Sequence, residues 1–440
     1  MCSDTQIQPI PQADAELGLQ VLKAFRRERS PLVALRLMRD NLGDIFQINL
    51  PGFKPVFMSG PKYSRFVLVD GRENFLWRNE SDPVTRLLRH GLLVEDGTPH
   101  DRLRAPMNEI LSGKHVPAHV ETFWASTDTV TQHWQHGDSV DMLVEMRKIA
   151  LLIFMQALFA VDFGPDLERL WQPVLGLLKY ISPGLWIIAP NLPRPGYNKH
   201  IQSMDNYLYA LIRDRRANPI QSDDLLTRLV NIPEFDDDLI RDQLLTMLIA
   251  GHDTSTALLA WTLYLLGTHP KAMERATKEA RSTLHGSVPT TQSLTDLSFL
   301  DMVIKESLRL YPPIHVGNRR AAIDIHIDEY RIPFGTRVMY SIYLTQRDPK
   351  YWSEPDAFHP ERFDRSLGYK PIAFSYLPFG GGPRTCIGAA FAQVEAKAVL
   401  ARLLTKFELK LVDTNVKPFM GATLEPRPGV MMRILHRKTK

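Results

Sequence analysis

The sequence predicts a mainly α-helical protein with a small β-rich portion. Helical apolar periodicity dominates from about residue 61 to residue 310, and strand patterns are confined to short stretches on either side of it. No internal repeat or low-complexity linker divides the chain. The 440 residues, 44% hydrophobic and 23% charged, have the composition of a globular protein. We therefore predict one domain over residues 19–440, preceded by a flexible tail over residues 1–18.

The N-terminal part is predicted to contain helices followed by a hairpin. Residues 19–43 have helical patterns that end near Gly43. Apolar and polar residues then alternate in 44–51 and 54–60, around a Pro-Gly pair, which is typical of a β-hairpin. The long helical body follows, and its clearest helical patterns lie at residues 62–69, 101–111 and 203–217.

A Pro-, Gly- and aromatic-rich stretch, residues 181–200, interrupts the helical body. Loops of this length in compact domains are usually functional, so we predict a mobile lid. Strand patterns return at 321–343 and at 429–436. The most apolar segment, residues 239–267, contains four charged or titratable side chains, which favours a buried core helix over a membrane span.

Charge and cysteine content narrow the class of partner and compartment. The net charge is only +4, from 53 basic and 49 acidic residues, which does not suggest nucleic-acid binding. The N-terminus lacks a basic region followed by an apolar one, so we expect neither secretion nor a membrane anchor. Two cysteines far apart do not form a disulfide framework. We expect a cytoplasmic, monomeric protein.

The second cysteine, Cys386, lies in the unusual stretch FGGGPRTCIG, residues 379–388. A lone cysteine can be buried filler, a catalytic nucleophile or a metal ligand. The glycines lack the spacing of a phosphate-binding loop, and no second Cys or paired His is near enough to suggest zinc. A nucleophile stays possible. A single axial thiolate to haem iron needs only one Cys, with Arg384 available for a propionate.

This stretch resembles the haem-binding signature of the cytochrome P450 superfamily, F-x-x-G-x-R-x-C-x-G. Five positions match: Phe379, Gly382, Arg384, Cys386 and Gly388. Three further family motifs occur in the order that the family has, and the resemblance covers roughly residues 20 to 440. It implies the cytochrome P450 fold and a haem b (iron protoporphyrin IX) whose iron has Cys386 as axial ligand, with Phe379, Arg384 and Gly388 also contacting the cofactor.

Two of the further motifs are expected to form a structural charge network. ESLR matches the family pattern E-x-x-R at Glu306 and Arg309, and FHPERF supplies Arg362. Exposed i, i+3 charge pairs are common, but this pair lies in an apolar context. The resemblance implies a buried Glu-Arg-Arg network that holds the backbone leading into the cysteine loop.

The third motif, AGHDTST, lies within the long apolar helix. Gly251 removes side-chain bulk and Thr254 can hydrogen-bond back to the Ala250 carbonyl, and both favour a local distortion of the helix. The alternative is that this segment is an ordinary buried helix with a few polar residues and no catalytic role. The resemblance implies that Ala250 and Gly251 form an oxygen groove, and that Asp253 and Thr254 are catalytic residues that relay protons. His252 is assigned no chemistry.

Looser matches suggest the propionate contacts. His100 and Arg104 in HDRLR lie at i, i+4 on one helix face, where the family contacts haem propionates. Arg319 in GNRRA is a third candidate, with the adjacent Arg320 as its competitor. A surface cation is the alternative for each.

The resemblance implies a monooxygenase that inserts one oxygen atom from O2 into a hydrophobic small molecule. The short stretch after Cys386 holds no flavin or iron–sulfur motif, so electrons are expected from a separate ferredoxin or flavodoxin-type donor with its reductase. A peroxygenase or rearranging enzyme of the same fold is the alternative. A non-haem cysteine transferase or binding protein is a more remote one. Terpenoid, steroid, fatty acid and polyketide substrates all fit.

Overall fold

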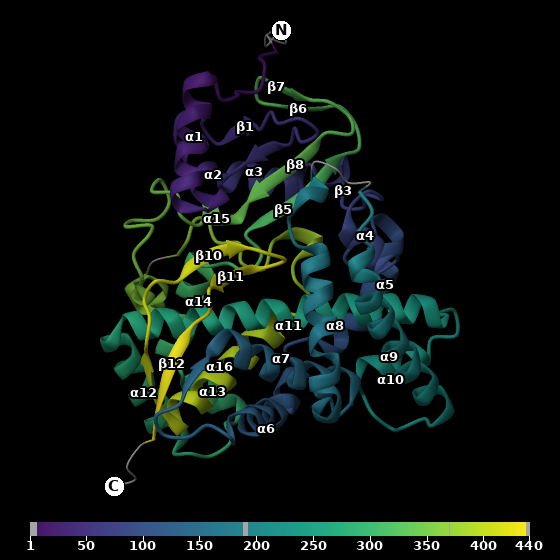
Figure 1. The fold of residues 1–440 in the computed structure, drawn as a ribbon, viewed down its shortest axis with the longest axis vertical. Helices are drawn as coiled ribbons and strands as arrows, with labels where there is room; N and C mark the ends of the chain where they lie inside the picture. The colour runs from purple at the N-terminus through teal and green to yellow at the C-terminus, as the bar shows by residue number, and fades with distance from the viewer. Residues whose placement is uncertain (1–6, 188–191, 369, 437–440) are drawn as a thin grey trace.

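The computed structural model describes residues 7–187, 192–368 and 370–436. One long helix, α11 (Asp237–Thr268), runs across the whole molecule (Figure 1). A layer of helices lies on one side of it, and the β-rich portion with the N-terminal helices lies on the other. The predicted mainly α-helical fold with a small β portion is confirmed.

The helices follow the sequence pattern closely. Helix α11 is buried along nearly its whole length, which explains why its sequence is apolar on all sides. It contacts α7, α9, α14 and α16. The α-helices are α1 (Ala15–Glu28), α2 (Pro31–Leu42), α3 (Gly60–Arg65), α4 (Pro83–Leu88), α5 (Gly97–Ile110), α6 (Val120–Thr131), α7 (Met142–Phe159), α8 (Leu167–Ile181), α9 (Asn198–Ala217), α10 (Leu225–Val230), α11, α12 (Pro270–Leu284), α13 (Thr291–Asp296), α14 (Ser298–Leu310), α15 (Ile342–Thr345) and α16 (Ala389–Lys406).

The β portion joins strands from distant parts of the chain. Its largest sheet has the order β1-β2-β8-β5-β3, in which β2 and β8 are parallel. A three-stranded sheet has the order β4-β12-β9, and β6–β7 and β10–β11 are hairpins. The strands are β1 (Ile45–Gln47), β2 (Val56–Met58), β3 (Phe75–Leu76), β4 (Ser139–Asp141), β5 (Val316–Ala321), β6 (Ile325–Ile327), β7 (Tyr330–Ile332), β8 (Arg337–Ser341), β9 (Phe407–Leu411), β10 (Lys417–Met420), β11 (Leu424–Arg427) and β12 (Met431–His436).

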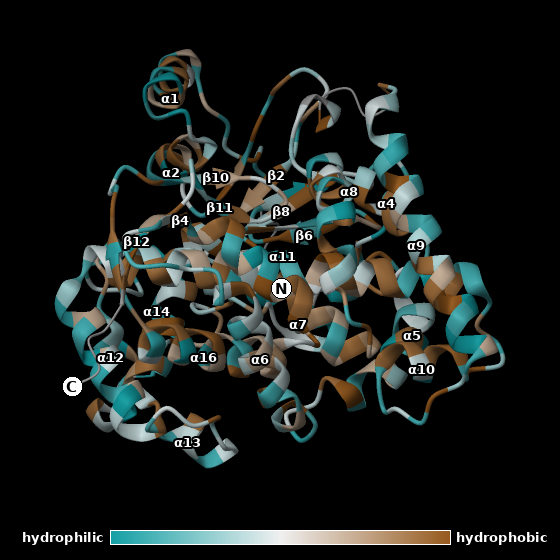
Figure 2. Ribbon diagram, turned by 60° about the horizontal axis from the view of Figure 1, so that its bottom comes forward, coloured by the Kyte–Doolittle hydropathy of each residue, from teal (hydrophilic) through white to brown (hydrophobic). Residues whose placement is uncertain are grey.

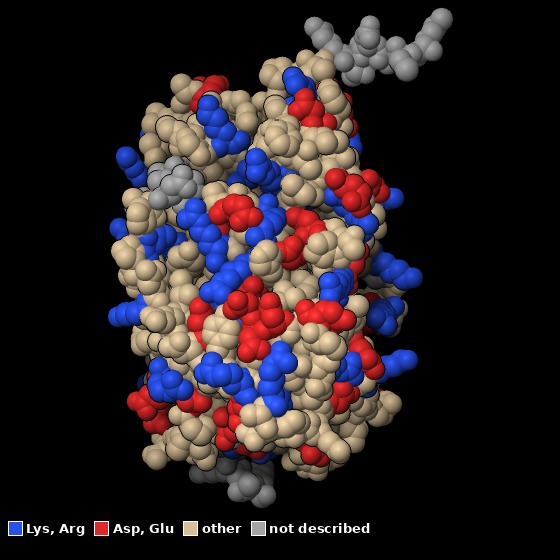
Figure 3. Space-filling model, turned by 90° about the vertical axis from the view of Figure 1, so that its right-hand side faces the viewer, with Lys and Arg blue, Asp and Glu red and all other residues tan. Residues whose placement is uncertain are grey.

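The core has two main parts. The larger one fills the space between the helices around α7 and α11, where hydrophobic residues gather (Figure 2). The second lies between the five-stranded sheet and α3. Within the described residues, no helix is both long enough and apolar enough to cross a bilayer. On the face drawn in Figure 3, basic and acidic side chains are interspersed.

Two sequence expectations need comment. The predicted tail over residues 1–18 is wrong for its described second half: the Gln8 amide donates to the Glu329 carbonyl at 2.8 Å, Ile10 is buried and α1 begins at Ala15. Ile10 joins the apolar cluster under the sheet, which gives this segment a reason to be ordered. The predicted lid contains two short 3₁₀ turns, and residues 188–191 within it lie outside the described part.

Candidate active site

The cysteine loop connects the 3₁₀ turn η9 (Gly382–Arg384) to the start of α16. The Cys386 backbone N–H donates to the Phe379 carbonyl at 2.8 Å, which closes the loop. Gly382 has a φ of +67°, and a Cβ there would lie 2.4 Å from the Leu68 carbonyl oxygen. Only glycine therefore permits both this turn and the close packing against Leu68. The loop shape thus depends on the glycine and on a contact from a distant part of the chain.

The Cys386 side chain is reachable from solvent, although many protein atoms surround its sulfur. Cys386 is exposed, yet surrounding protein atoms raise the pKa of its thiol, loss of water being the largest cause. The Gly388 backbone N–H and the positive charge of Arg104 act in the opposite direction and favour the thiolate. A metal ion that binds such a sulfur removes its proton outright. The free protein therefore favours the thiol at Cys386, and binding of a metal ion would convert it to the thiolate.

Four cationic or titratable side chains lie close together beside this loop. Arg104 donates to the Thr385 carbonyl at 2.7 Å, and Arg384 pairs with Asp96 at 2.8 Å. Burial is the main cause that lowers the pKa of Arg384, and the charges of Arg319 and Arg104 lower it further. Burial also lowers the pKa of His100, with smaller contributions in the same direction from Arg384 and Arg104. The structure thus brings the four predicted propionate contacts into one group.

The structure also separates the two candidate arginines on β5. Arg319 is buried, donates to its neighbour's carbonyl at 2.8 Å and stacks over Trp77. Arg320 is exposed and stacks over Phe334. Successive side chains point to opposite faces of a strand, which explains the difference. The charge of Arg319 is among the causes that lower the pKa of Arg384, so Arg319 lies close to the cysteine loop and is favoured for the propionate role.

The three residues of the predicted charge network are in contact, with Glu306 and Arg309 fully buried and Arg362 partly buried. Arg309 donates to both carboxylate oxygens of Glu306, at 2.7 and 2.8 Å, and neither side chain is exposed. Arg362 donates to the same carboxylate at 3.0 Å. Arg309 also donates to three backbone carbonyls of the segment 346–357. The network therefore joins α14 to the segment that precedes the cysteine loop.

Helix α11 has an open stripe on an otherwise buried surface. Ala250 is exposed, while Gly251 and Thr254 are half-buried, and these three positions share one helix face. Thr254 Oγ1 donates to the Ala250 carbonyl at 2.7 Å, as predicted. Helix α11 is continuous through this motif, and the local distortion stays a prediction. A Cβ at Gly251 would lie 2.4 Å from the Phe154 ring, so glycine here permits close packing against α7.

Asp253 points away from this stripe into a buried polar cluster. Its carboxylate accepts from Arg147 at 2.9 Å and from the Thr423 hydroxyl at 2.8 Å. Glu425 accepts from the same guanidinium group at 2.6 Å. Burial alone would lower the pKa of Arg147, but the two carboxylates outweigh it and the pKa is raised. The sequence missed Arg147, Thr423 and Glu425, because no local pattern connects three distant segments.

A comparison with protein families gives the assignment. The family model for cytochrome P450 matches residues 17–436, almost the whole chain. The chain belongs to the cytochrome P450 family. It is a cytochrome P450 monooxygenase, and cytochromes P450 bind haem through a cysteine thiolate.

Similar curated proteins cover most of this P450. A cytochrome P450 139 of Mycobacterium bovis is 30% identical over 409 residues, 89% of this chain and 95% of its own. A cytochrome P450 132 from the same organism is 29% identical, covering 88% and 89% of the two chains. The cyclooctat-9-en-7-ol 5-monooxygenase of Streptomyces melanosporofaciens is 29% identical, covering 87% and 84%.

The residues of this P450 fit a haem. Grouped cations withdrawn from water are unfavourable unless anions neutralise them, and two propionates would do so. Arg104 and Arg319 have no carboxylate within ion-pair distance in the described part of the chain, although Arg384 has Asp96. The sulfur of Cys386 is accessible to an iron, and α11 offers an exposed small residue for a flat ligand.

A further buried carboxyl lies on the helix that follows the cysteine. Glu395 is fully enclosed, and its Oε2 accepts from the Ser255 hydroxyl on α11 at 2.6 Å. Burial raises its pKa from an ordinary value of 4.5 to about 8, and the hydroxyl only partly opposes this. Glu395 is the one acidic residue in the apolar sequence of α16, and its burial was not predicted from the sequence.

Glu395 predicts a specific pH dependence of stability. The folded state holds its proton up to about pH 8 while the unfolded chain loses it near 4.5, so stability falls as pH rises between these values. The slope from this group approaches roughly 1.4 kcal/mol per pH unit. Glu395→Gln should remove it and be the more stable protein at pH 8, measured by urea unfolding. Glu234→Gln, at an exposed site, is the control; an unchanged slope in Glu395→Gln would contradict the prediction.

Proposed function

We propose that this P450 inserts one oxygen atom from O2 into a hydrophobic small molecule, by hydroxylation or epoxidation. A separate ferredoxin or flavodoxin-type donor with its reductase supplies the electrons. The observation that carries the proposal is the open stripe on α11, where a hydroxyl and a small residue interrupt a buried helix. The relative named as a cyclooctat-9-en-7-ol monooxygenase supports a largely hydrocarbon substrate.

Each group at the site has a distinct part in this reaction. When bound, haem supplies the iron that activates dioxygen, and a thiolate ligand favours cleavage of the O–O bond. Cys386 would provide that thiolate, with its negative charge stabilised by the Gly388 N–H and by Arg104. His100, Arg104, Arg319 and Arg384 would neutralise the propionates. The network around Arg309 would keep the loop in place.

Thr254 and Asp253, the two residues predicted to relay protons, have different hydrogen-bond partners. The Thr254 hydroxyl donates its hydrogen bond to the Ala250 carbonyl, which leaves its lone pairs free to accept a hydrogen bond from water. The Asp253 carboxylate accepts hydrogen bonds from Arg147 and from the Thr423 hydroxyl. To carry a proton toward the stripe, Asp253 must exchange at least one of these contacts. We therefore propose that Thr254 orders a water molecule at the stripe. Asp253 supplies protons to it more slowly, because its present contacts must first be exchanged.

Replacing Thr254 tests the proposal directly. Thr254→Ala should bind haem and consume electrons at a rate similar to wild type, because reduction does not need this hydroxyl. Product formed per NAD(P)H should fall severalfold, with the missing equivalents recovered as hydrogen peroxide. Asp253→Asn should have its larger effect on the turnover rate and its smaller effect on the product formed per NAD(P)H. Both ratios are measured with a reconstituted redox partner and a peroxide assay.

Two matched variants control this experiment. Thr254→Ser keeps the hydroxyl and should restore the wild-type ratio. The Thr256 hydroxyl also donates to the carbonyl four residues earlier, that of His252, at 2.8 Å. Thr256 is fully buried, so Thr256→Ala removes a hydroxyl that does not face the stripe. It should leave the ratio unchanged. An unchanged ratio in Thr254→Ala would remove the hydroxyl from the mechanism. Activity with peroxide but none with O2 and electrons would indicate a peroxygenase.

A further inference from the structure

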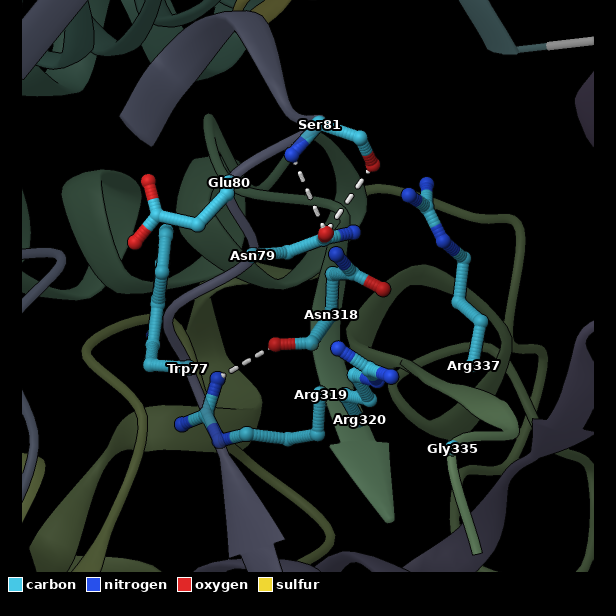
Figure 4. A pocket seen from close by; sticks show the side chains of 9 residues that line it. All are labelled: Trp77, Asn79, Glu80, Ser81, Asn318, Arg319, Arg320, Gly335 and Arg337. Carbon is cyan, nitrogen blue, oxygen red and sulfur yellow. Dashed lines mark hydrogen bonds between the residues drawn. The ribbon is translucent and has the colours of Figure 1, made fainter. Parts of the chain in front are cut away.

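A cationic cavity lies at the edge of the five-stranded sheet, lined from β5, from the turn before β8 and from the segment after β3 (Figure 4). Its volume is about 450 Å³. Three arginines line it: Arg319, Arg320 and Arg337. In Figure 4, Arg319 extends toward Trp77, whereas the side chain of Arg337 lies on the opposite side of the view. Since the structure favours Arg319 for the propionate, Arg320 and Arg337 are left without a role in the haem site.

Arg320 and Arg337 are directly opposite each other in the β5–β8 ladder. Like charges at such a pair of positions destabilise a sheet. Burial lowers the pKa of Arg337, and its nearest carboxylate, Asp82, is 3.8 Å away. Arg320 forms no ion pair in the described part of the chain. Arg320 therefore lacks a close counter-charge, and Arg337 has only the long ion pair with Asp82.

The polar groups around the pair do not supply that counter-charge. Glu80 lines the cavity, but its carboxylate is engaged with Arg78 at 2.5 Å and points away from the arginine pair. Asn79 accepts from Ser81, which leaves its amide N–H groups available. The buried Oδ1 of Asn318 has no hydrogen-bond partner in the structure. The cavity thus offers several unused donors, which an oxyanion would satisfy, whereas the Asn318 oxygen needs a separate donor such as water.

A second hollow continues from this cavity. It shares Ser81, Gly335 and Arg337 with the first and has a volume of about 520 Å³. Its other walls include Phe53, Trp186, Ile187 and Phe334. Phe334 is 65% exposed, unusual for so large an apolar side chain. A cationic end and an aromatic groove therefore form one continuous surface.

We propose that this surface binds an amphipathic small molecule with an anionic end group, a carboxylate, sulfate or phosphate. The end group pairs with Arg320 and Arg337, whose planar guanidinium groups suit oxyanions in a bidentate geometry. The apolar part lies along Phe334 and Trp186. Binding at Arg320 and Arg337 can be measured without turnover, so this proposal can be tested independently of the proposed reaction.

Calorimetric titration of the haem-loaded protein tests this site without turnover. Three probes are used: decanoate, neutral decan-1-ol and inorganic phosphate. Wild type should bind decanoate saturably and more tightly than either of the other two. Arg320→Gln should weaken decanoate binding at least about tenfold, the scale of one charge-assisted contact, and leave decan-1-ol unchanged. Phe334→Ala should weaken decanoate and leave phosphate unchanged.

Arg433→Gln is the matched control. Arg433 is opposite Lys410 in another sheet, and both are exposed, so water screens their charges. This variant should bind all probes as wild type does. Absence of saturable decanoate binding, or equal binding by Arg320→Gln, would overturn the proposal. Phosphate binding that Arg320→Gln abolishes, without a preference for decanoate, would overturn the amphipathic assignment and indicate a free-anion site.

Discussion

Glu306→Ala should accumulate little folded, haem-loaded protein. The carboxylate pairs with Arg309 and Arg362 and also accepts from the His359 amide at 2.9 Å, and it is fully buried. Removal leaves two guanidinium groups without their shared counter-charge. Breaking a buried ion pair from one side costs about 3–5 kcal/mol, a large part of the stability of a typical domain. Haem per chain and the urea midpoint measure the loss.

Glu361→Ala is the matched control for this prediction. Glu361 forms an ion pair with Arg275 at 2.8 Å, but both side chains are about half exposed. Exposed pairs contribute about 0–1 kcal/mol, so this variant should unfold close to the wild-type midpoint. If Glu306→Ala and Glu361→Ala unfolded at the same urea concentration with full haem content, the buried network would have no special role in stability.

The second large effect concerns Cys386. Cys386→Ala should reduce product formation to background, because the described chain offers no other cysteine to the iron. Cys386→His should retain haem, since imidazole is also an iron ligand, but should lose oxygen insertion because it lacks the electron-donating thiolate. Product per enzyme and haem per chain are measured together. Cys2→Ser is the control, and it should behave as wild type; residual wild-type activity in Cys386→Ala would contradict the assignment.

The features that the sequence predicted correctly are local in the chain. The E-x-x-R pair is within one helical turn, so its spacing alone brings the two side chains together. The bond from Thr254 to Ala250 is likewise i to i−4. The hairpin of β1 and β2 and the terminal strand β12 followed from alternation and turn residues. In each case the physical cause lies within about ten residues.

The features that the sequence did not predict depend on distant contacts. The partners of Asp253 come from α7 and from the β10–β11 turn, so no spacing along the chain indicates them. Gly251 was interpreted as opening a groove, whereas Phe154 of α7 occupies the space that a side chain would need. The choice of Arg319 over Arg320 required the face of β5 to be known. Tertiary packing decides all three.

The most direct test of haem–thiolate ligation is the absorption spectrum of the reduced protein under carbon monoxide. Wild type should show the red-shifted Soret band of a thiolate-ligated iron, and Cys2→Ser should show the same band. Cys386→His should bind haem but give the unshifted band of a nitrogen-ligated iron. A wild-type spectrum without the shift, or a shifted band that persists in Cys386→Ala, would contradict the assignment of Cys386 as the iron ligand.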